Sequence, residues 1–356
     1  MGAQETISND LPMHYEDVTA EWVTQALRRR WPGVTVTGLR HAQTIGGTGS
    51  KIQLELEYDD AGLAAGLPPR LFVKGGFEWH EVAFAASYQA EARFYADWAP
   101  SIAANIPQGY FAEWNDRQGV VLIEDLSLRP VTFGSGDVAP LDVATIRKVL
   151  ALLARIHAPF WNKPTLATLR SLGQRVGTNF IDHFLAPDYY ASCIAQPKGQ
   201  PIPQAFHDPR RMLAGLRANW AQVDTGPQSF CHGDPHQGNM FFETDGRPGY
   251  LDFQAYVRCA PLHDVNYVVV GSLSVEDRRQ HDRALLGFYL DELKALGVRD
   301  LWSSDEAWDR FRRHTMHGLL WFATPEAMQP AAIVEAHSLR FGTAANDYEL
   351  PALLGV

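Results

Sequence analysis

The chain contains little cysteine, no excess of positive charge and no long run of apolar residues, and each absence excludes a class of protein. Its three cysteines are too few and too scattered for a disulfide framework or a paired-cysteine metal site. Acidic residues outnumber basic residues by 41 to 31, and the net charge of -10 argues against a nucleic-acid-binding surface. No apolar run approaches the roughly 18 residues of a membrane-spanning helix. The polar start of the chain has no signal-peptide pattern. We therefore expect a cytoplasmic protein that has neither nucleic acids nor membranes as partners, with its oligomeric state left open.

The remaining composition is that of a globular protein with room for one large or two ordinary domains. The chain has 356 residues, of which 46% are hydrophobic and 20% are charged. In the first third, apolar residues alternate with polar ones from Ile52 to Tyr58, which predicts a half-buried strand. Residues 71–73 and 119–123 are typical of further strands, and residues 81–98 of a helix.

Beyond residue 126 the pattern changes from strands to helices. A linker-like stretch at 129–136 comes first, and Ser274 has the position of an N-cap in a capping box. The apolar spacing predicts helices near residues 146–156, 210–223, 274–296, 305–322 and 331–345. We predict an α+β protein with a β-rich N-terminal lobe at 1–126 and a mainly helical C-terminal lobe at 127–356.

One motif in the helical part carries the chemistry. The stretch 232–239 reads His-Gly-Asp-Pro-His-Gln-Gly-Asn, and the stretch 251–254 reads Leu-Asp-Phe-Gln. They supply a carboxylate at Asp234, an amide at Asn239 and a second carboxylate at Asp252. Phosphoryl transfer from ATP needs this set: one aspartate deprotonates a hydroxyl, while an asparagine and an aspartate hold magnesium. Apolar residues 240–242 and turn-forming residues 244–249 predict a hairpin between the two stretches.

The order of these features resembles the aminoglycoside phosphotransferase and choline kinase superfamily, and most closely its ecdysteroid-kinase-like branch. A glycine-rich turn is followed by Val73-Lys74, by Glu91 in a helix, and then by the two stretches above. Three segments indicate the branch: Val121–Ser127, Leu153–Trp161 and the Leu-Asp-Phe-Gln form of the metal motif. The resemblance covers roughly residues 40 to 345. It implies a bilobal, protein-kinase-like fold that binds ATP and Mg²⁺.

The resemblance also implies a role for each matched residue. Lys74 contacts the α- and β-phosphates and is paired with Glu91, Asp234 is the catalytic base, and Asn239 and Asp252 bind magnesium. His232 is structural, and Asp264 stabilises the catalytic loop. The glycine-rich turn covers the nucleotide with Gly46, Gly47, Gly49 and Ser50. The inter-lobe connection contacts the adenine edge through backbone groups of Glu124, Asp125 and Leu126. Thr48 or Ser50 is the alternative phosphate contact.

The acceptor is expected to be a small molecule with a hydroxyl group. Nothing between Asp252 and Asp264 corresponds to the activation loop of a protein kinase. The ecdysteroid-kinase-like resemblance favours a bulky, largely apolar alcohol, and an aminoglycoside or a choline- or ethanolamine-type acceptor is the alternative. His236 lies within the catalytic loop and either approaches the acceptor or packs.

Two functions of another class compete with the kinase. The first is a metal-dependent hydrolase, because His232, Asp234 and His236, with Asp252, offer a plausible zinc cluster. That reading leaves Lys74 and Glu91 unexplained. The second is a pseudoenzyme that binds a nucleotide without turnover, and the presence of every residue needed for turnover speaks against it.

Overall fold

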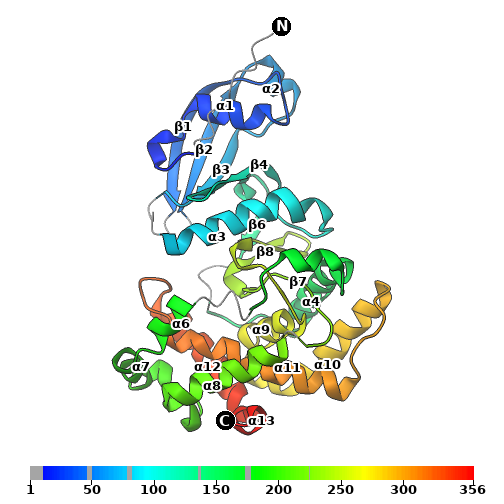
Figure 1. The fold of residues 1–356 in the computed structure, drawn as a ribbon. Coiled ribbons are helices and arrows are strands. Elements are labelled where there is room, and N and C mark those ends of the chain that lie inside the picture. Colours follow the sequence, from blue (N-terminus) through cyan, green and yellow to red (C-terminus); the bar gives the residue numbers. More distant parts are fainter. Residues whose placement is uncertain (1–10, 46–49, 78–81, 135–137, 173–177, 224) are drawn as a thin grey trace. The chain divides into compact units, whose positions relative to one another are not determined.

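The computed structural model describes residues 11–45, 50–77, 82–134, 138–172, 178–223 and 225–356, and these form two compact units (Figure 1). The sheet unit comprises the residues up to Ile102, Ile106–Val131 and Leu251–Ala255, and the helical unit comprises Ala103–Asn105, Thr132–Tyr250 and Tyr256–Val356. The Leu-Asp-Phe-Gln motif therefore groups with the N-terminal residues, although the sequence placed it in the C-terminal lobe.

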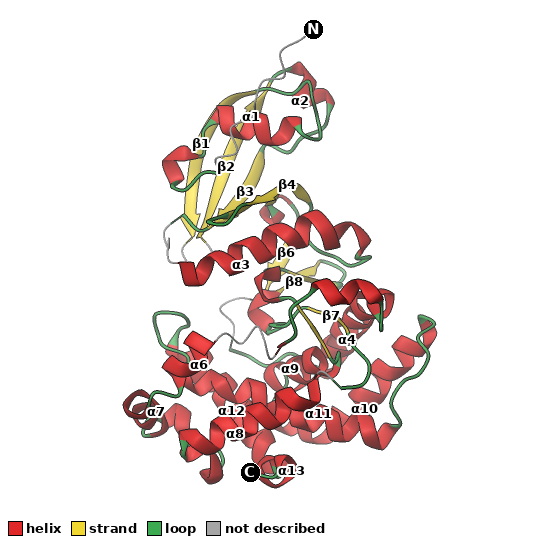
Figure 2. Cartoon of the chain, viewed as in Figure 1, coloured by secondary structure: helices red, strands yellow, loops and turns green. Residues whose placement is uncertain are grey.

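The sheet unit is built on a five-stranded antiparallel sheet. Alternation of apolar and polar residues from Ile52 to Tyr58 produces a strand with one buried face, as predicted. The strand order is β1-β2-β3-β5-β4 (Figure 2). The strands are β1 (Val36–Ile45), β2 (Ser50–Tyr58), β3 (Arg70–Gly75), β4 (Gly109–Trp114) and β5 (Gly119–Glu124).

One face of this sheet buries the core of the unit against helix α1 (Ala20–Arg28). Thr19 caps α1, because its side chain accepts a hydrogen bond from the backbone N–H of Trp22. The ring of Trp22 packs edge-on against Phe111, with 5.5 Å between the ring centroids. The core residues from the sheet include Ile52, Leu54, Leu71, Val73, Val120 and Leu122. A short helix, α2 (Asp60–Ala64), follows β2.

Helix α3 packs against β4 and β5 on the sheet and also holds the Leu-Asp-Phe-Gln segment. It spans Val82–Arg93 and continues as a π-helical turn, Phe94–Trp98, so the helix predicted at 81–98 changes its winding at Phe94. Phe94 stacks on Phe253, with ring centroids 3.8 Å apart and planes within 3°. This stacking explains why residues 251–255 belong to the sheet unit.

The helical unit surrounds one fully buried helix. Every residue of α9 (Leu262–Ser272) is buried, and α9 packs against α4, α10, α11 and α12. Ser274 caps α10, as predicted, by accepting a hydrogen bond from the N–H of Asp277. The other helices are α4 (Val143–His157), α6 (Thr178–Phe184), α7 (Pro187–Ile194), α8 (Pro209–Val223), α10 (Val275–Ala295), α11 (Ser304–Gly318), α12 (Ala331–Asp347) and α13 (Leu350–Leu354).

Short strands frame the catalytic stretch. The predicted hairpin is present as β8 (Met240–Glu243) and β9 (Pro248–Tyr250), with Met240 opposite Tyr250. The stretch expected to be a linker contains one more strand, β6 (Val131–Phe133), and the sheet order is β6-β8-β9. Strand β7 (Ser229–Cys231), directly before the loop, pairs with β10 (Val257–Cys259). The α+β class predicted from the sequence is confirmed.

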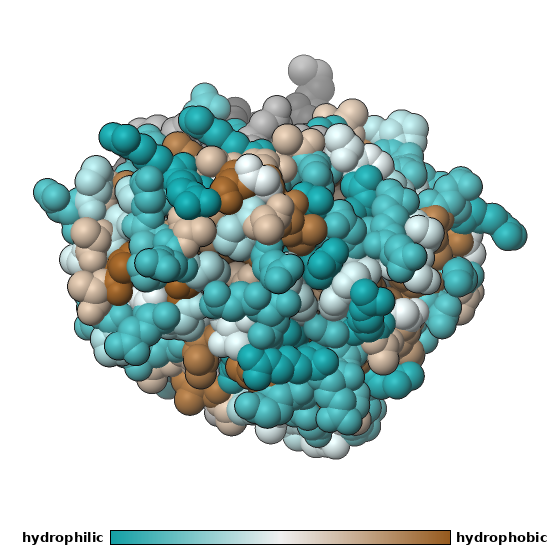
Figure 3. Space-filling view, turned by 90° about the horizontal axis from the view of Figure 1, so that it is seen from below, coloured by the Kyte–Doolittle hydropathy of each residue, from teal (hydrophilic) through white to brown (hydrophobic). Residues whose placement is uncertain are grey.

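The one face of the surface that Figure 3 shows is mainly hydrophilic. On the face shown in Figure 3, hydrophobic residues are scattered among hydrophilic ones. Across the described residues, no helix combines the length and the apolar character needed to cross a bilayer. The three cysteines are buried free thiols.

Candidate active site

The sheet unit holds a buried lysine between two carboxylates. The ammonium of Lys74 lies 2.7 Å from Glu91 Oε2 and 3.0 Å from Asp252 Oδ1. Lys74 and Glu91 are both buried, while the side chain of Asp252 is 28% exposed. The ion pair that the family resemblance implied is therefore present, and it includes the carboxylate of the Leu-Asp-Phe-Gln motif.

These neighbours decide the charge of the lysine. Burial disfavours the ammonium form, but the charges of Asp252 and Glu91 outweigh this effect and raise the pKa of Lys74. Burial raises the pKa of Glu91, while the charge of Lys74 opposes that rise. Lys74 therefore remains a cation at neutral pH, which a contact with phosphate requires.

A second lysine, Lys51, lies directly beside Lys74, and the sequence analysis missed it. The register of β2 and β3 places Lys51 opposite Lys74, and directly opposed residues on antiparallel strands point to the same face. Burial, followed by the charge of Lys74, lowers the pKa of Lys51. The sequence contained one sign that Lys51 lies near the site, because Lys51 immediately follows the glycine-rich turn and Ser50.

Asp252 adopts an uncommon backbone conformation. Its φ is +57°, in the left-handed region that few residues other than glycine occupy. Beside it, Gln254 donates a hydrogen bond to Glu91 Oε2 at 3.4 Å. A strained residue in a candidate metal motif is typical of a functional constraint.

In the helical unit, one buried carboxylate holds the backbone of the catalytic loop. Asp264 is fully buried and accepts hydrogen bonds from the N–H groups of His232, at 2.6 Å, and Gly233, at 3.0 Å. The Nε2 of His263 lies 3.3 Å from the carbonyl oxygen of Gly233. Gly233 has a φ of +82°, which glycine adopts without strain. The loop-stabilising contact implied for Asp264 is present.

Side chains within the loop fix its turn. His232 Nδ1 accepts a hydrogen bond from the N–H of Asp234 at 3.3 Å, which agrees with a structural His232. The side-chain N–H of Asn239 donates to the carbonyl oxygen of Asp234 at 2.9 Å. Because the amide nitrogen of Asn239 is used in this way, its amide oxygen is the atom suited to binding a metal.

The side chain of Asp234 is the exposed group of the loop. It is 39% exposed, and His236 Nε2 lies 3.7 Å from its Oδ2. His236 Nδ1 accepts a hydrogen bond from the N–H of Gly238 at 3.0 Å, so Nε2 carries the proton of the neutral ring. His236 also packs edge-on against Trp321, with 5.5 Å between ring centroids. Of the two roles left open for His236, the structure shows packing together with proximity to Asp234.

A buried ion pair lies beneath the loop. His157 Nε2 is 3.2 Å from Asp264 Oδ2, and His157 Nδ1 is 2.8 Å from the hydroxyl of Tyr289. Burial opposes the charged imidazole, but the hydrogen bond to Asp264 outweighs it and raises the pKa of His157 to about 9. Burial likewise opposes the carboxylate form of Asp264, but the hydrogen bond and charge of His157 lower its pKa. These contacts give His157 a structural role.

The zinc cluster of the rival hydrolase does not assemble in the part of the chain that the structure describes. There, the group of side chains with converging metal-ligand atoms is His157, Cys231 and Asp264, and all three are buried. His157 is engaged with Tyr289, and Asp264 with the loop backbone. His232 and His236 each use Nδ1 within the loop.

Of the remaining candidate residues, Ser50, Glu124, Asp125 and Leu126 belong to the sheet unit. Gly46, Gly47, Gly49 and Thr48 lie outside the described residues. Ser50 begins β2 with a buried hydroxyl that has no hydrogen-bond partner among the described residues.

In the expected connection, Glu124 ends β5, and Asp125 and Leu126 enter a 3-10 turn, Leu126–Leu128. The Asp125 carboxylate accepts from Gln53 at 2.7 Å and from the Ser127 N–H at 2.9 Å, which gives it a structural role.

Comparison with known proteins shows a similarity to one family over part of the chain. The β-rich unit with its lysine–glutamate pair, followed by a helical unit with a His-Gly-Asp loop, has the order expected of a kinase-like fold. The model of the ecdysteroid kinase-like family matches residues 178–300, which include the catalytic loop, the Leu-Asp-Phe-Gln motif and Asp264. The resemblance stated from the sequence is confirmed over this region.

Several solved structures are similar to the chain at low sequence identity. Aminoglycoside phosphotransferase APH(3'')-Id from Streptomyces rimosus, in complex with ADP and streptomycin, is 16% identical; the match covers 86% of this chain and 98% of that one, with a TM-score of 0.43. Macrolide 2'-phosphotransferase MphH from Brachybacterium faecium is 18% identical, covering 89% and 97%, with a TM-score of 0.46. Choline kinase LicA from Streptococcus pneumoniae is 12% identical, covering 89% and 98%, with a TM-score of 0.46. No curated protein sequence matches the chain.

Proposed function

We propose that the protein is a kinase that transfers the γ-phosphoryl group of ATP to a hydroxyl of a small, bulky and largely apolar alcohol. The observation that carries this proposal is the buried ammonium of Lys74 between Glu91 and Asp252. The zinc-hydrolase alternative leaves this arrangement unexplained. A phosphotransferase needs a fixed cation for the phosphates and a carboxylate beside it for the metal.

The proposed reaction uses charged side chains from both units. The oxygen of the acceptor hydroxyl attacks the γ-phosphorus, Asp234 accepts the hydroxyl proton, and the bond to the leaving ADP breaks. Lys74 neutralises negative charge on the phosphates, and Glu91 keeps its ammonium in place. Positioning and charge neutralisation provide most of the catalysis in such a loose transition state.

The residues present fit a magnesium ion. Mg²⁺ prefers oxygen ligands, and Asp252 offers a carboxylate while Asn239 offers its amide oxygen. The left-handed backbone of Asp252 is the second sign of a constrained role. When bound, the ion neutralises charge on the phosphate oxygens.

Nucleotide contacts are proposed for both ends of the sheet unit. The buried hydroxyl of Ser50, which has no partner within the described part of the chain, is suited to a phosphate oxygen. The glycines before it are proposed to offer their backbone N–H groups to the phosphates. The carbonyls of Asp125 and Leu126 already accept hydrogen bonds from the N–H groups of Leu128 and Arg129. We therefore propose that adenine forms its hydrogen bonds mainly with the Glu124 carbonyl and the Leu126 N–H.

The surroundings of Asp234 support an apolar acceptor. His236 packs against Trp321, Trp321 stacks on His337, and the indole N–H of Trp321 donates a hydrogen bond to the hydroxyl of Tyr267. Burial lowers the pKa of His337 well below its usual range, so this ring is neutral. Neutral aromatic groups suit an apolar alcohol, whereas a polycationic aminoglycoside requires carboxylates.

The direct test is an ATP-consumption assay with purified full-length protein, with and without Mg²⁺. The acceptor panel contains a sterol-type alcohol, a macrolide, streptomycin and choline. We expect magnesium-dependent turnover that is fastest with an apolar alcohol, and Asp252→Ala should weaken magnesium–nucleotide binding. Fastest turnover with streptomycin or choline would overturn the acceptor class, and stoichiometric zinc without ATP consumption would overturn the kinase.

A further inference from the structure

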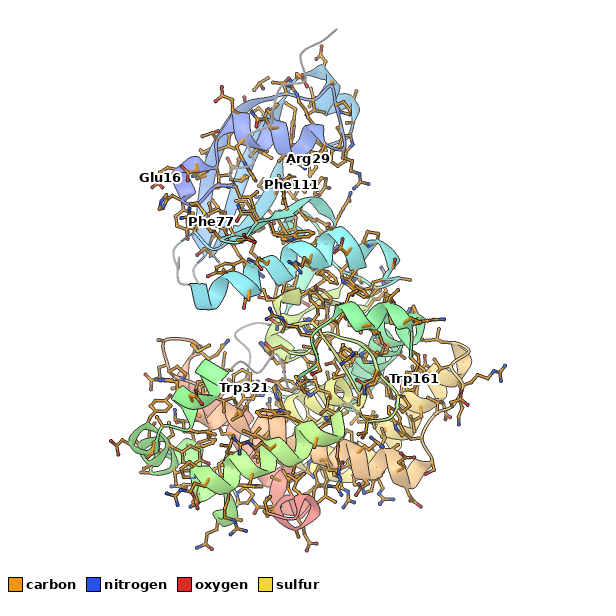
Figure 4. The ribbon with its side chains drawn as sticks, in the orientation of Figure 1. Glu16, Arg29, Phe77, Phe111, Trp161 and Trp321 are labelled. Atoms are coloured by element: carbon orange, nitrogen blue, oxygen red, sulfur yellow. The ribbon has the colours of Figure 1, made fainter. Side chains whose placement is uncertain are left out.

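An indole ring next to the catalytic loop is held in place by two imidazoles. Trp321 lies in a 3-10 turn, Leu319–Ala323, between α11 and α12, and its side chain is 7% exposed (Figure 4). It stacks on His337, with ring centroids 4.2 Å apart and planes at 14°. The ring of His236 meets it edge-on at 85°. These contacts from separate elements fix the plane of the indole and the direction of its N–H.

This N–H decides the direction of a hydroxyl on the central helix. Trp321 Nε1 donates a hydrogen bond to the hydroxyl oxygen of Tyr267, on α9, at 2.8 Å. An indole nitrogen can only donate, so the hydroxyl of Tyr267 must accept this bond. The proton of the hydroxyl is then directed to another acceptor. Tyr267 is 6% exposed, so bulk water is poorly placed to be that acceptor.

The candidate acceptor is the carboxylate of Asp234, whose charge acts on the hydroxyl of Tyr267. Tyr267 lies three residues after Asp264 on α9, and residues at this spacing share one side of a helix. Asp264 holds the backbone of Gly233, the neighbour of Asp234. Burial, followed by the charge of Asp234, raises the pKa of Tyr267 well above its usual range, as expected for a phenol facing a carboxylate.

We propose that Tyr267, oriented by Trp321, is a positioning residue that holds the Asp234 carboxylate for proton transfer. The inference rests on the proposed function, in which Asp234 is the base. A donor on one carboxylate oxygen fixes its rotation and directs the other oxygen towards the acceptor hydroxyl. His236 Nε2, at 3.7 Å, approaches the same carboxylate.

The test is a double-mutant cycle on the full-length protein. Tyr267→Phe removes only the hydroxyl, and Trp321→Phe removes the indole N–H while an aromatic ring remains. The probe is Mg²⁺-ATP with the best acceptor of the panel, or with water if none is phosphorylated. We expect Tyr267→Phe to lower kcat about tenfold and Trp321→Phe about threefold, with KM for ATP within about twofold. The double variant should match Tyr267→Phe alone, because Trp321 acts through that hydroxyl.

Matched controls separate positioning from folding. Tyr348 is also 6% exposed, and its hydroxyl donates to Asp282 at 2.7 Å. Trp302 is 6% exposed, and its indole N–H has no hydrogen-bond partner within the described residues. Tyr348→Phe should lower the melting temperature without changing kcat, and Trp302→Phe should leave kcat unchanged.

The outcomes distinguish the inference from the proposed function. Unchanged kcat in Tyr267→Phe, with an inactive Asp234→Asn, overturns the inference and leaves the kinase intact. Additive losses in the double variant overturn the role of Trp321. If Tyr267→Phe does not fold, Trp321→Phe alone decides: lowered kcat supports the inference and unchanged kcat overturns it. A wild type that consumes no ATP with any probe overturns both.

Discussion

The two units hold their functional carboxylates in opposite ways. In the sheet unit, Glu91 and Asp252 both contact the ammonium of Lys74, so the group that would bind phosphate is also the centre of a buried ion-pair network. In the helical unit, the side chain of Asp234 is 39% exposed and makes no buried ion pair. The buried carboxylate of that unit, Asp264, accepts hydrogen bonds from the backbone of the loop.

This difference separates catalysis from folding in one unit and combines them in the other. A buried charge that loses its partner is costly, because nothing compensates for its removal from water. An exposed carboxylate has water as an alternative partner. Substitutions in the buried ion-pair network of the sheet unit should therefore reduce stability and activity together. Substitutions in the helical loop should reduce either stability or activity.

The largest effect is expected for Asp234→Asn. Losing the base should lower kcat on the order of a thousandfold. Nucleotide affinity and melting temperature should stay at their wild-type values, because the side chain is 39% exposed and the substitution keeps its shape. Steady-state kinetics, nucleotide titration and thermal unfolding measure the three quantities. A large fall in melting temperature would break the contrast between the units.

Lys74→Ala should affect both activity and stability. Activity should fall by about a hundredfold, because fixed positive charge at the phosphates is lost. Unfolding free energy should fall by about 3 kcal/mol, because buried Glu91 and its neighbour Asp252 lose their shared cation. Chemical denaturation measures the second effect, with exposed Lys148→Ala as the control. Wild-type stability in Lys74→Ala would contradict the network.

The sheet unit also shows how much the sequence could predict. The alternation from Ile52 to Tyr58 predicted the right strand, because burial on one face is a local property. The lysine–glutamate pair was expected from a family resemblance and is present. Lys51 was missed because its proximity to Lys74 depends on the pairing of two strands, which composition does not reveal.

In the helical unit, the catalytic loop was recognisable but its support was not. Residues 267–270 lie in the fully buried helix α9. The hydroxyl of Tyr267 has a further contact because Trp321, distant in sequence, donates to it. The only local sign was the spacing of three residues from Asp264. Such contacts depend on how helices pack, and a periodicity analysis does not determine packing.

The ion pair beneath the loop makes stability depend on pH. The pKa of His157 is raised from 6.5 to about 9, so its contribution is complete below pH 6.5 and is lost as pH rises through about 9. The shift corresponds to about 3 kcal/mol. Between these values, the unfolding free energy of the wild type should fall by about that amount relative to His157→Asn. Denaturation at several pH values measures it, with exposed His183→Asn as the control. Parallel pH curves for wild type and His157→Asn would show that the imidazole is not charged in the folded protein.

The smallest effect is expected for Lys51→Met, and it tests whether the sheet unit has one functional cation or two. Burial and the charge of Lys74 lower the pKa of Lys51, so its ammonium is held beside a like charge. The negative charge of bound phosphates would offset that repulsion. The resulting attraction to Lys51 should contribute on the order of 1 kcal/mol to nucleotide binding. We expect KM for magnesium–ATP to rise about fivefold with kcat within twofold. Lys51→Arg keeps the charge and should keep the KM. An unchanged KM in Lys51→Met would leave Lys74 as the cation that binds phosphate, and Lys51 would then only cover that face of the sheet.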